Sequence, residues 1–137
     1  MAKFVYDDVS VTVNSVDLSD HVQSVTLSAD VTEVDVTAMS DTWDQSLAGR
    51  KKVSGSITFY QDFSASSVDA TIWPLIGTTT TITLRATSDA VGATNPDYDI
   101  TNTVITSYGS ISGGTYGDAA MVTANFSGGT LSPSTTP

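Results

Sequence analysis

The sequence predicts an all-β protein, an antiparallel β-sandwich or barrel with one short flanking α-helix. In seven segments apolar residues alternate with Ser, Thr, Asn, Asp or Glu, which is typical of strands with one packed and one wet face. With 137 residues, 39% of them hydrophobic, the chain is long enough for one domain with its own core. The alternating apolar residues are Val9, Val11 and Val13; Val25 and Leu27; Val34, Val36 and Ala38; Ile57 and Phe59; Ile82, Leu84 and Ala86; Tyr98, Ile100 and Val104; and Ala120, Val122, Ala124 and Phe126.

The segment 66–75 is predicted to form the helix. Ser66 or Ser67 can cap its first turn, Asp69 lies where the helix dipole favours a negative charge, and apolar residues recur on one face. Pro74 is expected to end it. We expect Trp73 to cover an end of the sandwich, because aromatic side chains are commonly buried.

Three stretches are predicted to lie outside the packed strands. Residues 1–8 form an N-terminal arm, residues 40–53 a long inter-strand loop, and residues 128–137 a C-terminal tail rich in Gly, Ser, Thr and Pro. Hairpin loops usually have about two to five residues, so a loop of this length is expected to have a function. Free termini of this composition fray, and we expect neighbouring subunits to hold them.

The chain is acidic, with a net charge of −10 and a pI near 4.1. Tight binding to nucleic acid is therefore not expected, since it depends on Lys and Arg displacing condensed counterions. Three of the five basic residues, Arg50, Lys51 and Lys52, are adjacent in the sequence. Because adjacent like charges repel one another, we expect a negatively charged partner, and a second copy of this chain would qualify.

The sequence predicts a protein that is made in the cytoplasm and does not enter a membrane. Its first residues lack the long apolar stretch of a signal peptide. No apolar run approaches the roughly 20 residues that a membrane helix needs.

Catalytic chemistry lacks its usual parts. The sequence has no cysteine, no G-x-S-x-G or H-E-x-x-H motif and a single histidine, His21, whose place in the turn DLSDHV is more typical of a surface or capping residue than of a catalytic one. Asp97 and Asp99 would share one side of a strand, and a glycosidase uses two carboxylates for catalysis. Acids are, however, common at strand starts beside turns, which explains the pair without catalysis. Calcium at Asp97 and Asp99, or at Asp7 and Asp8, would lack the roughly six oxygens that the ion needs. We predict no enzyme activity, no cofactor and no metal site.

The remaining candidate functional residues lie on the water-exposed faces of two predicted strands. Glu33 and Asp35 are expected on the wet side of one strand, and Ser56 and Thr58 on the wet side of the next. Two interpretations stay open: an ordinary solvated sheet face, or the lining of a passage through which a polyanion slides.

The stretches VDLSDHVQSVTLS, EVDVTAMSDTWDQSLAGRKKVSGSITFYQDF and SVDATIWPLIGTTTTITLR resemble the major tail proteins of long-tailed, siphovirus-type bacteriophages. The resemblance runs from Asp17 to Phe126. It implies a tail tube subunit in the virion, a β-sandwich with a flanking helix that closes six-fold into rings, which stack head to tail. It also implies other tail proteins at the tube ends and DNA that passes through without specific binding.

The resemblance also implies roles for particular residues. The long loop would reach into the next ring, and its basic residues would meet acids of neighbouring copies such as Asp7, Asp8 or Asp44. A negatively charged bore would repel DNA and keep the passage open during genome ejection. The inter-ring residues are Trp43, Asp44, Leu47, Arg50, Lys51 and Lys52, and the lumen-facing residues are Glu33, Asp35, Ser56 and Thr58.

Two other functions fit the same composition. A capsid decoration or head-completion protein could share the β-sandwich and the acidic balance. A carbohydrate-binding module could use Trp43, Tyr60 and Tyr98 to stack on sugars. Filaments or rings of the purified protein would favour the tube, and binding to a glycan array would favour the module.

Overall fold

The structure is a computed structural model that describes residue 6, residues 8–112 and residues 114–135. It is mostly antiparallel β-sheet with one short α-helix, which confirms the predicted fold class. Eight strands form one sheet in the order β2-β1-β5-β6-β7-β4-β3, and β8 pairs with β6. The strands are β1 (Ser10–Val13), β2 (Val16–Asp17), β3 (Val22–Asp35), β4 (Ser46–Tyr60), β5 (Thr79–Arg85), β6 (Asp97–Tyr108), β7 (Met121–Ser127) and β8 (Thr130–Ser134).

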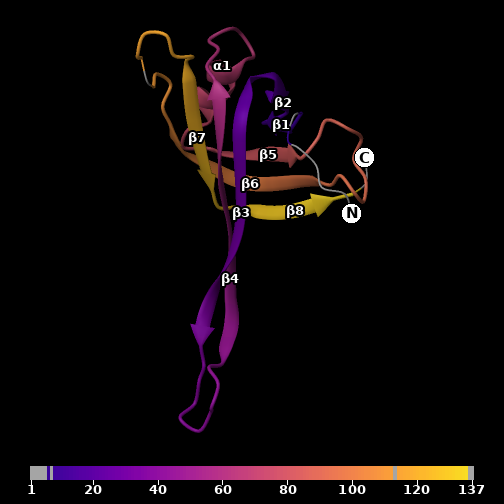
Figure 1. The fold of residues 1–137 in the computed structure, drawn as a ribbon, viewed down its shortest axis with the longest axis vertical. Helices are drawn as coiled ribbons and strands as arrows, with labels where there is room; N and C mark the ends of the chain where they lie inside the picture. Colours follow the sequence, from indigo (N-terminus) through magenta and orange to yellow (C-terminus); the bar gives the residue numbers. More distant parts are fainter. Residues whose placement is uncertain (1–5, 7, 113, 136–137) are drawn as a thin grey trace.

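The sheet folds over itself because β6 belongs to two layers. Its first half pairs with β5 and β8, and its second half pairs with β7. Gly128 and Gly129, at φ 84° and 88°, join β7 to β8 at the bend, and a Cβ on Gly129 would overlap the carbonyl oxygen of Thr101. As a result β5, β6 and β8 run across the direction of β3, β4 and β7 (Figure 1).

The core lies between these layers and contains ten of the twenty apolar residues that the alternation singled out, and three more, Val9, Val25 and Leu27, pack against it. The helical segment closes one end of it as α1 (Val68–Ile72) followed by the 3-10 turn η2 (Trp73–Leu75), close to the predicted 66–75. The buried hydrophobic residues are Val11, Val13, Leu18, Val53, Ile57, Phe59, Val68, Ile72, Ile82, Leu84, Ile100, Ile105, Val122, Ala124 and Phe126.

Strands β3 and β4 form a long hairpin whose far half projects from the body (Figure 1). They pair from Val22 opposite Phe59 to Asp35 opposite Ser46. The connection between them is residues 36–45. The predicted bounds of the long inter-strand loop, 40–53, were therefore wrong, because residues 46–53 belong to β4.

Three further sequence expectations are corrected. Val34 and Val36 were expected to pack, but each is 45% exposed, because they lie on or beside the projecting half of β3 and have no layer to pack against. Trp73 is 60% exposed and does not cover the core end. The predicted tail 128–137 contains β8, which pairs with β6.

The N-terminal arm falls largely outside the described residues. Within it, Tyr6 is exposed, and Asp8 accepts a hydrogen bond of 2.7 Å from the Ser88 hydroxyl.

Candidate functional site

The projecting hairpin is about 50 Å from end to end, since β4 has 15 residues at about 3.4 Å each. A bulge interrupts the pairing between Val31, opposite Lys51, and Glu33, opposite Ala48. The extra residue is on β4. Gly49 lies there against Thr32, where a Cβ would come within 3.1 Å of the Thr32 carbonyl oxygen. Such a bulge increases the local twist, and Figure 1 shows the two strands crossing over one another.

The tip of the hairpin, residues 36–45, is an ordered loop with its own hydrogen bonds. Gln45 donates from its backbone N–H to the Thr37 hydroxyl (2.7 Å), and Ala38 donates to the Asp41 carboxylate (2.9 Å). Hydrogen bonding by Thr37 to Asp35, through its side chain and its backbone N–H, lowers the pKa of that carboxyl. The loop therefore has a defined shape while its large side chains face water.

Large apolar side chains are exposed along this hairpin. Val34 and Leu47 are directly paired across the strands, with exposures of 45% and 60%. At the tip, Trp43 is 80% exposed and Met39 is fully exposed. Large exposed apolar patches are typical of interaction sites, so the hairpin is the candidate contact surface.

The three adjacent basic residues lie on strand β4, not on the predicted loop. Lys52 is paired with Asp30 and Lys51 with Val31, while Arg50 lies in the bulge. All three are exposed, and within the part of the chain that the structure describes none of them forms an ion pair. Their charge is available to a partner.

The four residues expected to line a lumen do not share one continuous face. Ser56 is paired with Thr26, and Thr58 bonds Thr123 through its hydroxyl at 3.1 Å, so both lie on the hydroxyl-rich outer face of the β7-β4-β3 layer. Glu33 and Asp35 alternate with that face along β3 and lie on the projecting part of the hairpin, where the ribbon has twisted.

The other candidate residues are engaged within the body. His21 Nε2 lies 2.9 Å from Asp62, and hydrogen bonds from Ser64 are the main cause that lowers the pKa of Asp62. Asp97 accepts a 2.9 Å bond from Arg85, and Asp99 accepts one of 2.9 Å from Thr83. Each of these carboxylates therefore has a hydrogen-bond partner within the body.

The possible sugar-stacking aromatics are widely separated. Trp43 is at the hairpin tip, Tyr60 at the opposite end of β4 and Tyr98 on β6. They form no common platform. Among the described residues no group of three or more His, Asp or Glu side chains could hold a metal ion. No helix among them is long and apolar enough to cross a membrane.

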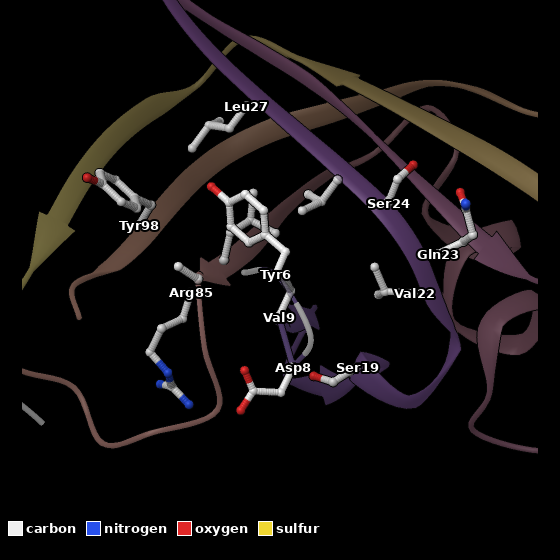
Figure 2. A pocket seen from close by; sticks show the side chains of 13 residues that line it. Tyr6, Asp8, Val9, Ser19, Val22, Gln23, Ser24, Leu27, Arg85 and Tyr98 are labelled. Atoms are coloured by element: carbon white, nitrogen blue, oxygen red, sulfur yellow. The ribbon is translucent and has the colours of Figure 1, made fainter. Parts of the chain in front are cut away.

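A groove of about 600 Å³ lies between β3 and the layer of β1, β5 and β6. Val22, Val25 and Leu27 line one wall, and Leu84 and Tyr98 belong to the other. Figure 2 shows Tyr6 over the middle of it, with Arg85 and Asp8 at one side. The alternation in the sequence marked most of these residues as apolar. It could not show that this side of the sandwich stays partly open.

Comparison with solved structures shows which known proteins have a similar fold. No protein-family model matches the sequence, and no curated protein matches it. A chain from the virion of a native gene transfer agent (GTA) particle is 16% identical, with a TM-score of 0.71 over 93% of this chain and 95% of that chain.

Two further solved structures agree. A chain from the tail of an empty GTA particle, computed with C6 symmetry, is 18% identical, with a TM-score of 0.63 over 82% of this chain and 81% of that chain. A chain from the sheath/tube terminator of an extracellular contractile injection system, PVC, in its extended state is 15% identical, with a TM-score of 0.74 over 97% of both. This chain shares its fold with proteins of these particles.

Proposed function

We propose that this chain is a structural subunit of a phage-type tail, and that it forms the tail tube by closing into six-fold rings that stack head to tail. The single observation that carries the proposal is the projecting hairpin, a long two-stranded element with exposed apolar and cationic side chains that its own body does not cover. A fold shared with virion and injection-system proteins supports it.

Ring closure is supported by the ends of the sheet. β3 is the last strand in the sheet order, so one of its edges has no strand partner among residues 8–112 and 114–135. Unpaired edges invite pairing with another chain, and a ring of copies removes every open edge at once. The β7-β4-β3 layer would then form the inner wall, with its Ser and Thr side chains toward the hollow.

Stacking is assigned to the hairpin. Trp43 and Leu47 would be buried against the next ring, and Arg50, Lys51 and Lys52 would meet acids of neighbouring copies, such as Asp44. One exposed ion pair contributes under about 1 kcal/mol, but symmetry repeats each contact around every ring.

The lumen is proposed to repel DNA. Glu33 and Asp35, which the twist of the projecting part would turn toward the passage, would place negative charge along it when repeated by symmetry, and the side chains of Ser56 and Thr58 are uncharged. DNA would pass without specific binding, as genome ejection requires.

The test removes the hairpin and keeps the body. Replacing residues 31–51 by Asn-Gly joins the paired residues Asp30 and Lys52 through a two-residue turn. Because the buried core lies outside this segment, the variant is expected to fold, which a thermal melt checks. Electron microscopy should then show rings or monomers without stacked tubes. Tubes like those of the unmodified protein would contradict the proposal.

A further inference from the structure

The groove beside β3 is a partly open side of the hydrophobic core. Val22, Val25 and Leu27 pack against the buried core while remaining partly exposed to water. Across the groove, Tyr98 is 38% exposed. Covering such a surface removes apolar area from water and is therefore favourable.

Acidic side chains lie on or beside the lining residues at one side of the groove (Figure 2). Asp8 lines it, Asp17 accepts a bond of 2.9 Å from the backbone N–H of the lining residue Ser19, and Asp97 bonds the lining residue Arg85 at 2.9 Å. Among the described residues, three carboxylates and one guanidinium lie at this side of the groove, so its charge is negative. An occupant that brings apolar side chains together with positive charge would fit this site on both counts.

The projecting hairpin has both properties. It exposes the paired side chains Val34 and Leu47, and it carries Arg50, Lys51 and Lys52 one bulge further along β4. Within the described part of the chain the remaining basic residue, Arg85, is already bonded to Asp97. The hairpin is therefore the cationic, apolar element that this chain offers to another copy.

We propose that the groove beside β3 receives the hairpin of a second copy, with Leu47 against the apolar wall and Lys52, on the same face of the hairpin, against the acidic rim. A protrusion and a groove on different parts of one chain form a head-to-tail contact, which continues from copy to copy when it does not close. The inference rests on the proposed function, because it names the receiving surface for the stacking hairpin.

Introduced cysteines test the contact without interference, since the chain has none of its own. A chain with both Leu47→Cys and Ala86→Cys places one thiol on the hairpin and one in the groove, so mild oxidation of assembled protein should give a ladder of linked chains. The matched control combines Leu47→Cys with Ile111→Cys, which is 86% exposed and away from the groove. It should give no ladder.

A second pair of variants needs no disulfide. Ala86→Lys adds a cation where the groove meets the cationic hairpin, and Ile111→Lys makes the same change elsewhere on the body. Ala86→Lys is expected to raise the concentration needed for filaments by about tenfold or more, and Ile111→Lys by less than about twofold. Thermal melts of both variants check that the body still folds.

The outcomes separate the two proposals. The groove contact is wrong if filaments form a ladder in the Ile111→Cys control and not in the groove variant. It is also wrong if the Ala86→Lys variant assembles like the unmodified protein. Neither result would contradict the tube proposal. If the unmodified chain forms no rings or filaments at any concentration, the tube proposal fails and the groove contact fails with it.

Discussion

Gly55 shows how a single backbone position fixes the packing of the β7-β4-β3 layer. It lies on β4 between Leu27 and Phe126, and the Phe126 ring occupies the place of the missing side chain, with Cζ 2.6 Å from where a Cβ would be. Only a residue without a Cβ leaves room for that ring. The alternation in the sequence cannot show this requirement, because it depends on a neighbour 71 positions away.

We predict that Gly55→Ala lowers the free energy of unfolding by about 1 to 3 kcal/mol, because the added methyl group must displace a buried aromatic ring or the Thr26 carbonyl. Chemical denaturation measures it. Gly109→Ala is the matched control, since a Cβ there meets nothing within 4 Å, and it should change stability by less than about 0.5 kcal/mol. Equal stability of the two variants would show that the packing around Gly55 is not as described.

Tyr108 connects the helix to the sheet. Its hydroxyl donates to Asp69 Oδ1 and accepts from Gln61 Nε2, both at 2.9 Å. Burial is the main cause that raises the pKa of Tyr108 to about 12. The folded state therefore holds the phenol proton at a pH where the unfolded chain, with a pKa of about 10, has released it.

The stability that this proton contributes is present below about pH 10 and is lost as the pH rises toward 12. We predict that Tyr108→Phe unfolds more easily at neutral pH, by about 1 kcal/mol for the lost hydrogen bonds. It should also show a smaller fall in stability between pH 10 and 12. Denaturant melts at several pH values measure both. An unchanged alkaline fall in the variant would mean that another group causes it.

The cationic segment of β4 is predicted to hold rings together through charge. Lys51→Gln with Lys52→Gln removes two positive charges from the hairpin, so tubes should come apart at lower salt than the unmodified tubes. Ala90→Glu with Thr94→Glu shifts the net charge by the same amount in the exposed loop 86–96 and should leave the salt midpoint unchanged. Light scattering over a salt series measures the midpoints. Equal shifts of the salt midpoint in both variants would show that the net charge, and not the cationic segment of β4, determines tube stability.

The acidic side chains of β3 are predicted to keep DNA moving. Glu33→Lys with Asp35→Lys should leave tubes intact but slow genome delivery, because cations on the wall would retain phosphate. Thr26→Lys with Ser28→Lys places cations on the hydroxyl face of the same strand and shows which face lines the passage. Ejection rates of particles built with each variant are the measurement. Normal ejection from particles with Glu33→Lys and Asp35→Lys would show that these two acids do not line the lumen.

How far the sequence predicts an element depends on whether that element has a layer to pack against. Ile57 and Phe59 alternate with polar residues because the core covers one face of β4, and the strand was predictable there. Residues 46–52 of the same strand have water on both faces, so no alternation marks them. β8 contains Pro133 and a single apolar residue, Leu131, and it forms because the bend at Gly128 and Gly129 returns the chain to β6.

The candidate site was predictable in composition but not in shape. Trp43, Leu47 and the three cations were recognisable from the sequence as an unusual cluster, and the structure places them together on one projecting element. The groove beside β3 depends on how the sheet bends, which is set by contacts between distant strands. Local patterns therefore gave no sign of it.

In the molecule as a whole, the negative charge and the positive charge lie on different parts of the structure. The body is a folded-over sheet with a negative surface, and the hairpin carries three of the five basic residues together with uncovered apolar side chains. A monomer gains little from this arrangement, because the hairpin makes few contacts with its own body and exposes apolar area to water. A stack of copies covers the hairpin and pairs unlike charges, so the arrangement favours assembly.

Electron microscopy of the purified chain at increasing concentration tests that central claim most directly. The account predicts rings with six-fold symmetry at low concentration and tubes of stacked rings at high concentration, with a hollow along the axis. A chain that stays a single particle of 14.3 kDa at every concentration, or that forms compact trimers without a hollow, would contradict it.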